Sequence, residues 1–155
     1  RIVTAESLTA GRISATLANI SGASGALNGG FNVYQDEMKE ALLGVPGTTL
    51  LQHTAVSSQV AEAMAAGALD KTGPHALGNK ASNLSIAVTG YAGSPGGFAP
   101  ESDAGLVYIA IGTQFNGAAK PTVKVHEHRF PGERDEVRSA VVDTALGYVH
   151  DILKP

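Results

Sequence analysis

Cysteine is absent from this 155-residue chain, as are any long apolar run and any cluster of basic residues. Without cysteine, disulfide scaffolds, thiol nucleophiles and cysteine metal sites are excluded, and a reducing compartment such as the cytoplasm is the expected location. No stretch is apolar for long enough to span a bilayer. The formal net charge of −3 and the scattered lysines and arginines argue against non-specific binding to nucleic acid or to an anionic membrane.

Size and composition instead indicate one globular domain over residues 1–155. The hydrophobic fraction of 43% and the charged fraction of 16% are ordinary for a folded protein of this length. No repeat, linker or low-complexity tract interrupts the chain. The chain begins without methionine, directly on a β-branched apolar segment, so we expect a helix to precede Arg1 in the natural protein.

Helical and strand patterns alternate along the chain. Strands are expected at residues 1–5, 31–34, 84–88, 105–112 and 122–130, and helices at 9–20, 36–43, 48–53, 59–71 and 135–153. This alternation predicts a three-layer α/β/α sandwich with a mixed, mostly parallel sheet and one antiparallel strand. We expect 122–130 to be that antiparallel strand, because a short turn joins it to the strand before it.

Ser7 lies where the first strand passes through small residues into a helical pattern. One interpretation is an N-cap, which would stabilise the helix by about 1 kcal/mol. The other is a nucleophile, because a strand-to-helix turn exposes a hydroxyl beside backbone N–H groups that favour developing negative charge. The turn lacks the G-x-S-x-G pattern of α/β-hydrolases, so spacing alone leaves both interpretations open.

Tyr34 and Lys39 supply a phenol and an amine at the end of the second strand and in the helix after it. Either group can activate a serine where burial and neighbouring charge favour its unprotonated form. The alternative is a packed tyrosine beside a solvated lysine, with Asp36 or Glu37 forming a surface ion pair of little energetic consequence.

Three further groups of residues are candidates for binding. The turn from Thr89 through Gly90 to Gly93 follows a buried strand, where glycines let backbone approach a ligand, although a flexible connection is the alternative. Arg134 and Arg138 lie one helical turn apart and suit a phosphate, or else belong to a solvated charge cluster. His126 and His128 share a strand face, but no third ligand at a familiar spacing supports a metal site.

The motifs taken in order resemble the CinA C-terminal domain family, whose enzymatic members are nicotinamide-nucleotide amidases, also called PncC. The segments that carry the resemblance are T-A-E-S-L-T-A-G at 4–11, G-F-N-V-Y at 30–34, Lys39, L-L-G-V at 42–45, A-V-S at 55–57, V-T-G-Y-A-G at 88–93, G-L-V-Y at 105–108 and F-P-G-E-R at 130–134. The family's first motif reads T-A-E-S-C-T-G-G, and the set covers almost the whole chain.

The resemblance implies an α/β/α sandwich and hydrolysis of the carboxamide of nicotinamide mononucleotide to nicotinate mononucleotide and ammonia, a step of pyridine nucleotide salvage. It implies Ser7 as nucleophile, with Tyr34 and Lys39 handling the proton. The residues expected to hold the substrate are Thr9, Ala10, Gly11, Thr89, Gly90, Gly93 and Arg134. It implies no metal and no cofactor, a small-molecule partner rather than nucleic acid or membrane, a homo-oligomer and a cytoplasmic location.

The chain departs from the family pattern at three places. Leu8 replaces a cysteine, Ala10 replaces a glycine, and the loop at 94–99 carries an extra residue and Phe98. Ala10 restricts the turn if that position needs a positive φ. These departures motivate two alternatives, a non-catalytic nucleotide-binding or assembly domain and an amidase for a different small amide.

Overall fold

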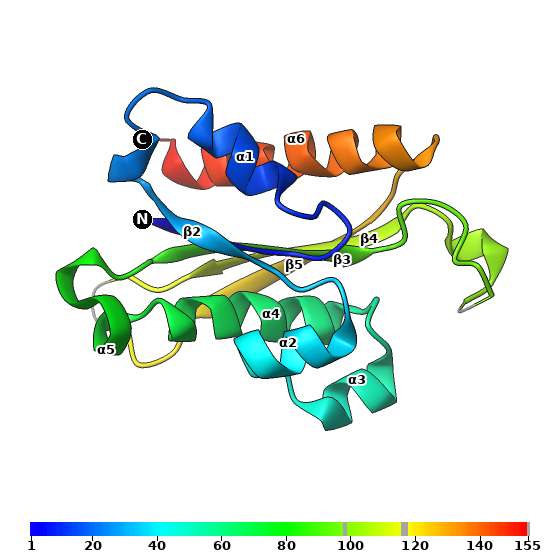
Figure 1. Ribbon diagram of the computed structural model, residues 1–155, viewed down its shortest axis with the longest axis horizontal. Helices are drawn as coiled ribbons and strands as arrows, with labels where there is room; N and C mark the ends of the chain where they lie inside the picture. Colours follow the sequence, from blue (N-terminus) through cyan, green and yellow to red (C-terminus); the bar gives the residue numbers. More distant parts are fainter. Residues whose placement is uncertain (98, 116–117, 155) are drawn as a thin grey trace.

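The computed structural model describes residues 1–97, 99–115 and 118–154. A five-stranded sheet crosses the middle of the molecule, with helices above and below it (Figure 1). In chain order the elements are β1 (Ile2–Glu6), α1 (Arg12–Ala18), η1 (Ala23–Gly25), β2 (Leu27–Asn32), α2 (Asp36–Leu43), α3 (Gly47–His53), α4 (Ser58–Lys71), α5 (Pro74–Leu77), η2 (Gly78–Lys80), β3 (Leu84–Gly90), η3 (Glu101–Asp103), β4 (Leu106–Thr113), β5 (Thr122–Arg129) and α6 (Arg134–Leu153). The predicted three-layer α/β/α architecture is confirmed.

The strands lie in the order β2-β1-β3-β4-β5. β1 pairs in parallel with both β2 and β3, whereas β4 is antiparallel to β3 and to β5. The one antiparallel strand is therefore β4, and the prediction that residues 122–130 would be that strand was wrong. In the described part of the connection from β3 to β4, residues 91–97 and 99–105, the structure has the short η3 and irregular chain, whereas a parallel return needs a longer crossover, usually a helix.

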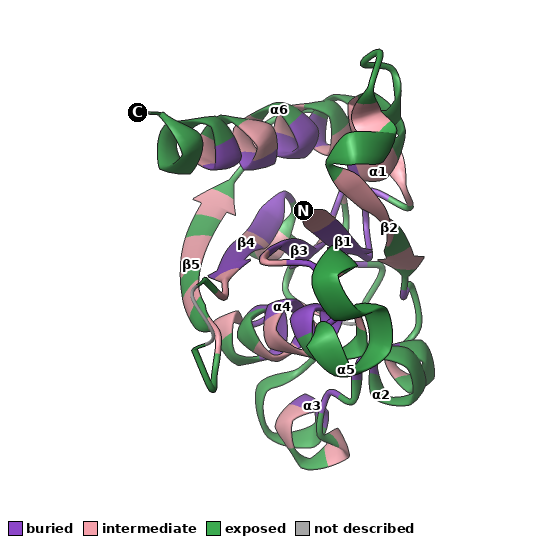
Figure 2. Ribbon diagram, turned by 90° about the vertical axis from the view of Figure 1, so that its left-hand side faces the viewer, coloured by how far each residue is buried: buried purple, intermediate pink, exposed green. Residues whose placement is uncertain are grey.

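Two apolar cores lie on opposite faces of the sheet. Figure 2 shows the buried residues of α4 and α6 turned toward the sheet from opposite sides. Val60, Met64 and Leu69 belong to the core under α4, while Ile13 and Val141 belong to the core under α1 and α6. All three of these α4 side chains are fully buried. Ile152 is exposed, contrary to its helical spacing, because the 20-residue α6 is longer than the strands it covers.

The second strand begins and ends earlier than its sequence predicts. β2 spans Leu27–Asn32 rather than residues 31–34, because pairing with β1 outweighs the low β-propensity of its two glycines. Gly30 is required there, since a Cβ would lie 2.3 Å from Thr4 Oγ1 and 2.4 Å from Ser14 Oγ. The close approach lets α1 pack directly against the edge of the sheet.

The first helix is shorter than predicted. α1 begins at Arg12 rather than at residue 9, because Gly11 adopts φ 90° and closes the preceding turn. The helix ends at Ala18, and Ile20 beyond it is exposed. Within the described ranges, no helix is both long and apolar enough to cross a membrane.

Candidate active site

The ends of three strands place the predicted site residues at one edge of the sheet. β1, β2 and β3 are parallel, so the segments that follow them lie together, on the right in Figure 1. The connection from β1 to β2 covers one face of the sheet through α1, and the connection from β2 to β3 covers the other through α4. The carboxyl ends of β1 and β3 therefore form a topological switch point, where open α/β sheets bind ligands.

Ser7 follows β1 directly at this switch point and is 8% exposed. Its N–H donates to Val88 O at 3.1 Å, and its carbonyl accepts from Ala10 N at 3.1 Å. The N-cap of α1 is Gly11, which makes no side-chain capping bond. The N-cap interpretation of Ser7 is therefore wrong, and the structure leaves its hydroxyl free of that role.

Glu6, the last residue of β1, satisfies the start of α1 instead. Its fully buried carboxylate accepts from Ile13 N and Thr9 Oγ1 at 3.0 and 2.7 Å through Oε2, and from Ser14 N and Oγ, both at 3.0 Å, through Oε1. Ser14 Oγ also lies 2.5 Å from Thr4 Oγ1. An acidic residue directly before a strand-to-helix turn was a sequence signal for this role, because carboxylates stabilise helix N-termini.

The turn from Ser7 to Gly11 holds backbone in an unusual conformation. Ala10 adopts φ 50° and Gly11 φ 90°. The position of Ala10, where the family has a glycine, therefore does need a positive φ. Within the described ranges, the N–H groups of Leu8, Thr9 and Gly11 donate to no protein acceptor. Unpaired backbone N–H groups and a serine hydroxyl in one turn are the kinds of group that take part in acyl transfer, the N–H groups by stabilising an oxyanion.

The side chain of Thr9 is not available to a ligand, and the role that the resemblance implied here was for the backbone of residues 9–11. It is fully buried and donates to Glu6 Oε2. The whole residue is buried, so what Thr9 can contribute to a site is its backbone N–H, which has no protein acceptor within the described residues.

Lys39 occupies an inward position of α2, one turn before the buried Leu43, and is 1% exposed. Its ammonium donates to Asp36 Oδ1 at 3.0 Å and to the backbone carbonyl of Tyr34 at 3.4 Å. The interpretation as a solvated lysine is wrong. Lysine is almost never fully buried unless it is paired, because removing its charge from water costs several kcal/mol.

Tyr34 contributes differently from its predicted role. Its backbone carbonyl accepts from Lys39, while its side chain is 55% exposed. The structure thus brings Tyr34 and Lys39 together at the end of β2, with the phenol at the protein surface.

In the turn after β3, the first residues are fixed by packing, whereas Gly93 has space around it. Thr89 is buried and donates to Ala55 O at 2.6 Å, which ties β3 to the segment before α4. Gly90 pairs with Val107, and a Cβ there would lie 2.6 Å from Leu106 O. Gly93 has open space around it, so it alone of the three predicted glycine-turn residues is free to approach a ligand. Phe98, the residue that distinguishes this loop, lies outside the described residues.

The two arginines of α6 do not form the predicted phosphate pair. Arg138 donates from Nε to Leu8 O at 2.9 Å and from Nη2 to Thr9 O at 3.1 Å. Arg134 is exposed at the first position of α6. Sequence spacing placed both on one helix face, but could not reveal that one of them reaches the turn after β1.

The histidines of β5 form an aromatic cluster with α6. His126 stacks on Tyr148 with 3.9 Å between ring centroids, and His128 Nε2 lies 2.8 Å from Tyr148 Oη. Burial, together with the charges of Lys124 and His128, lowers the pKa of His126. No group of three metal-ligating side chains occurs within residues 1–97, 99–115 and 118–154.

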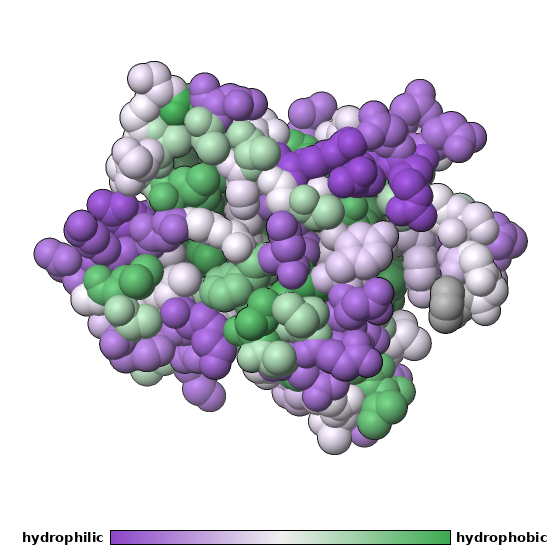
Figure 3. Space-filling model, viewed as in Figure 1, coloured by the Kyte–Doolittle hydropathy of each residue, from purple (hydrophilic) through white to green (hydrophobic). Residues whose placement is uncertain are grey.

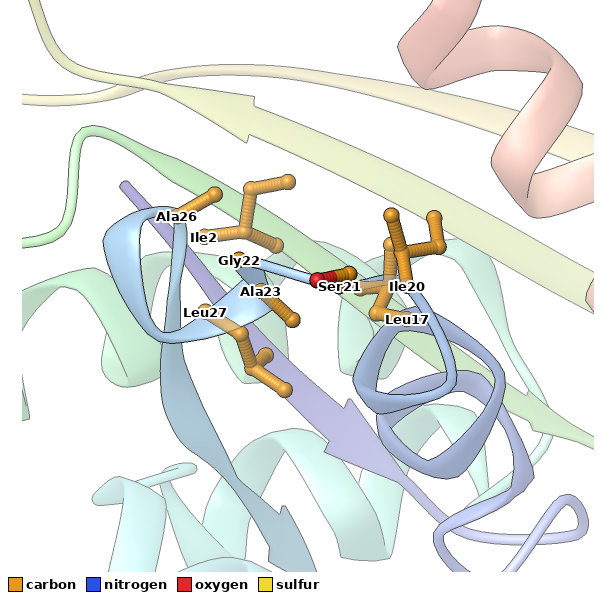
Figure 4. A pocket seen from close by; sticks show the side chains of 8 residues that line it. All are labelled: Ile2, Leu17, Ile20, Ser21, Gly22, Ala23, Ala26 and Leu27. Carbon is orange, nitrogen blue, oxygen red and sulfur yellow. The ribbon is translucent and has the colours of Figure 1, made fainter.

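A separate hollow of about 150 Å³ lies at the opposite edge of the sheet. Figure 4 shows its lining, mainly apolar side chains from α1, η1 and the starts of β1 and β2, including Ile2, Leu17 and Leu27. Figure 3 shows apolar side chains gathered there, at the upper left. Among the described residues that line the hollow, Ser21 has the one polar side chain, and the hollow lies at the amino end of β1, so it is distinct from the Ser7 edge.

Known proteins resemble the chain over nearly its full length. A family model described as the CinA C-terminal domain matches residues 1–153. A CinA-like protein of Leptospira borgpetersenii serovar Hardjo-bovis is 39% identical over 153 residues, which are 99% of this chain and 33% of that protein. A CinA-like protein of Geobacter sulfurreducens is 39% identical over 145 residues, 94% of this chain and 32% of that protein. The chain therefore spans about one third of the length of these relatives.

Solved structures agree with this assignment. The competence/damage inducible protein of Agrobacterium tumefaciens is 37% identical, with a TM-score of 0.83 over 99% of this chain and 85% of that one. A competence-damaged protein (CinA) superfamily member from Enterobacter cloacae is 31% identical, with a TM-score of 0.84 over 99% of this chain and 82% of that one. Family model, sequence and fold coincide, and the chain belongs to the CinA C-terminal domain family.

Proposed function

We propose that this domain is an amidohydrolase that converts nicotinamide mononucleotide to nicotinate mononucleotide and ammonia, with Ser7 as its nucleophile. The observation that carries the proposal is the combination at one sheet edge of a serine without a capping role, a turn with unpaired N–H groups and a buried lysine. The first two are the parts of an acyl-transfer site, and the third is a proton-handling group.

In the proposed reaction Ser7 Oγ attacks the carboxamide carbon, and its proton passes to Lys39 acting as the free amine or to Tyr34 acting as the phenolate. The N–H groups of the turn hold the tetrahedral oxyanion. The C–N bond then breaks, the proton is returned to the nitrogen, and ammonia leaves. Water attacks the acyl-serine and releases the carboxylate, so no redox step or cofactor enters the scheme.

Burial of Lys39 supports this role over a purely structural one. Asp36, its ion-pair partner, is itself about half exposed, so the pair is not a sealed buried salt bridge. An apolar residue would fill the inward position beside Leu43 at no desolvation cost. Retention of a cation there is typical of a functional site, where groups are placed against their ordinary solvation preference.

Ala10 does not exclude catalysis. It adopts the positive φ that the turn requires, so the turn forms despite the added Cβ. This removes the main structural reason for preferring a non-catalytic nucleotide-binding or assembly domain.

The test is ammonia release from nicotinamide mononucleotide by the wild-type chain, its Ser7→Ala variant and a Ser24→Ala control. Ser24 is exposed in the η1 turn, away from the carboxyl edge of the sheet. We expect the control to match the wild type and Ser7→Ala to lose turnover by at least about 10³-fold while keeping its fold. Full activity of Ser7→Ala would contradict the mechanism.

Absence of release by a folded wild-type protein would contradict the substrate. A panel of small amides would then separate an amidase of different specificity, which releases ammonia from another member, from a domain that binds pyridine nucleotide without turnover.

A further inference from the structure

We propose that Arg138 is a positioning residue of the hydrolase, which fixes the Leu8–Thr9 peptide of the Ser7 turn so that its N–H donor, that of Thr9, faces the oxyanion. This inference rests on the proposed function. The side chain lies well over 100 residues from Ser7 in the sequence, and its hydrogen bonds to the turn are made to backbone carbonyls.

One guanidinium holds two consecutive carbonyls of the turn. Arg138 Nε donates to Leu8 O at 2.9 Å, and Nη2 donates to Thr9 O at 3.1 Å. The planar fork of arginine offers two donors in a fixed geometry, whereas lysine offers a single rotatable ammonium. The contact therefore sets the orientation of two adjacent peptide planes as well as supplying charge.

The geometry of a trans peptide links the contact of Arg138 with Leu8 O to the direction of the Thr9 N–H. In a trans peptide the C=O and the N–H of the next residue point in opposite directions. Because Leu8 O faces Arg138 and α6, the N–H of Thr9 faces away from α6. That N–H is one of the donors without a protein acceptor within the described residues. A cation on the carbonyl side also polarises the peptide and strengthens the opposite N–H as a donor.

The turn needs such support because its conformation is unfavourable on its own. Ala10 has a positive φ, and Thr9 is fully buried with an unpaired N–H. Each feature costs free energy and persists only where surrounding contacts determine it. Arg138 supplies one such contact from outside the turn.

A second link between α6 and the same segment supports this interpretation. Arg12, the first residue of α1, donates to Asp135 Oδ1 and to Ser139 Oγ, and the ion pair lowers the pKa of Asp135. The first turns of α6 therefore hold the chain on both sides of Gly11. Hydrophilic side chains cover this region, where α6 begins at the upper right of Figure 3.

The test compares Arg138→Lys and Arg138→Gln with Lys71→Gln, a control that removes an exposed cation from the last turn of α4. We expect both Arg138 variants to lose about 10- to 100-fold in kcat with KM changed less than about threefold, because a misoriented oxyanion donor affects the transition state. Lysine should not rescue the rate. A rise in KM alone, or full activity of Arg138→Lys, would overturn the proposal and make Arg138 a substrate contact or a simple charge.

A second measurement does not depend on turnover. The amide proton of Ala10, which donates to Ser7 O, should exchange at least about tenfold faster in Arg138→Lys than in wild type, with the control unchanged. If the domain has no hydrolase activity, every one of these proteins is inactive, but the exchange still reports whether Arg138 orders the turn. Unchanged exchange in Arg138→Lys overturns the positioning role by itself. If Arg138→Gln does not fold, the lysine variant decides both measurements.

Discussion

Glu6→Gln should destabilise the protein strongly, although it only replaces one carboxylate oxygen with an NH₂ group. The carboxylate accepts four hydrogen bonds, two at each oxygen, from Thr9, Ile13 and Ser14. Glutamine offers one acceptor oxygen and one NH₂ group. Whichever way the amide is oriented, its NH₂ group faces one backbone N–H, whose bond is lost, and one hydroxyl, which must change from donor to acceptor.

The magnitude follows from the lost bond and the weakened one. A hydrogen bond to a charged group contributes about 1.5–3 kcal/mol, which is lost for the backbone N–H, and the hydroxyl bond loses about 0.5–2 kcal/mol because its partner is no longer charged. Loss of a negative charge at the start of α1 adds about 0.3–1 kcal/mol. The variant recovers part of this because it no longer buries a charge. We expect a net loss of about 2–4 kcal/mol, which is a fall in Tm of about 4–16 °C for a domain of this size.

Urea denaturation followed by circular dichroism measures this loss in the 155-residue chain. Glu37→Gln is the matched control, because Glu37 is exposed in the first turn of α2 and should change stability by less than about 0.5 kcal/mol. An unchanged m-value would show that the variants share one unfolding transition. If Glu6→Gln changes the free energy of unfolding no more than Glu37→Gln does, the buried carboxylate does not hold the turn.

Two further predictions concern backbone strain and pH. Ala10→Gly should stabilise the protein by about 0.5–1 kcal/mol, because the relief of left-handed strain at φ 50° exceeds the entropic cost of glycine; a lower urea midpoint would contradict this. Burial lowers the pKa of His126 below 6.5, so the unfolded chain binds the proton more tightly. Stability from this group is full above about pH 6.5 and is lost as the pH falls toward the folded-state pKa. His126→Phe, which keeps a ring against Tyr148, should therefore lose less stability than wild type between about pH 7.5 and 5.5; equal losses would contradict the assignment.

The order and type of the main elements were readable from local sequence. The bounds of α2 were predicted without error, and those of α4 and α6 within one residue, because apolar spacing and terminating glycine or proline act within a few residues. β2 was misplaced because its pairing with β1, a tertiary contact, outweighs the propensities of Gly29 and Gly30. The antiparallel strand was misassigned because strand direction depends on the connection on both sides, not on the strand itself.

The candidate site, like the fold, could be predicted from the sequence only in part. Family motifs identified Ser7, Tyr34 and Lys39 from sequence alone, and the structure places all three beyond the carboxyl ends of β1 and β2. Local reasoning could not decide whether Ser7 caps a helix or whether Lys39 is solvated, because burial and hydrogen-bond partners depend on residues far along the chain.

By itself, then, the sequence determined the family, the alternation of helices and strands and the residue types of the candidate site. Only the tertiary structure decided which groups remain free to react. Glu6 takes over the capping of α1, and Arg138 takes up the carbonyls of Leu8 and Thr9 across more than 100 residues. Such contacts leave no local signature, because a hydrogen bond depends on distance in space rather than on separation along the chain.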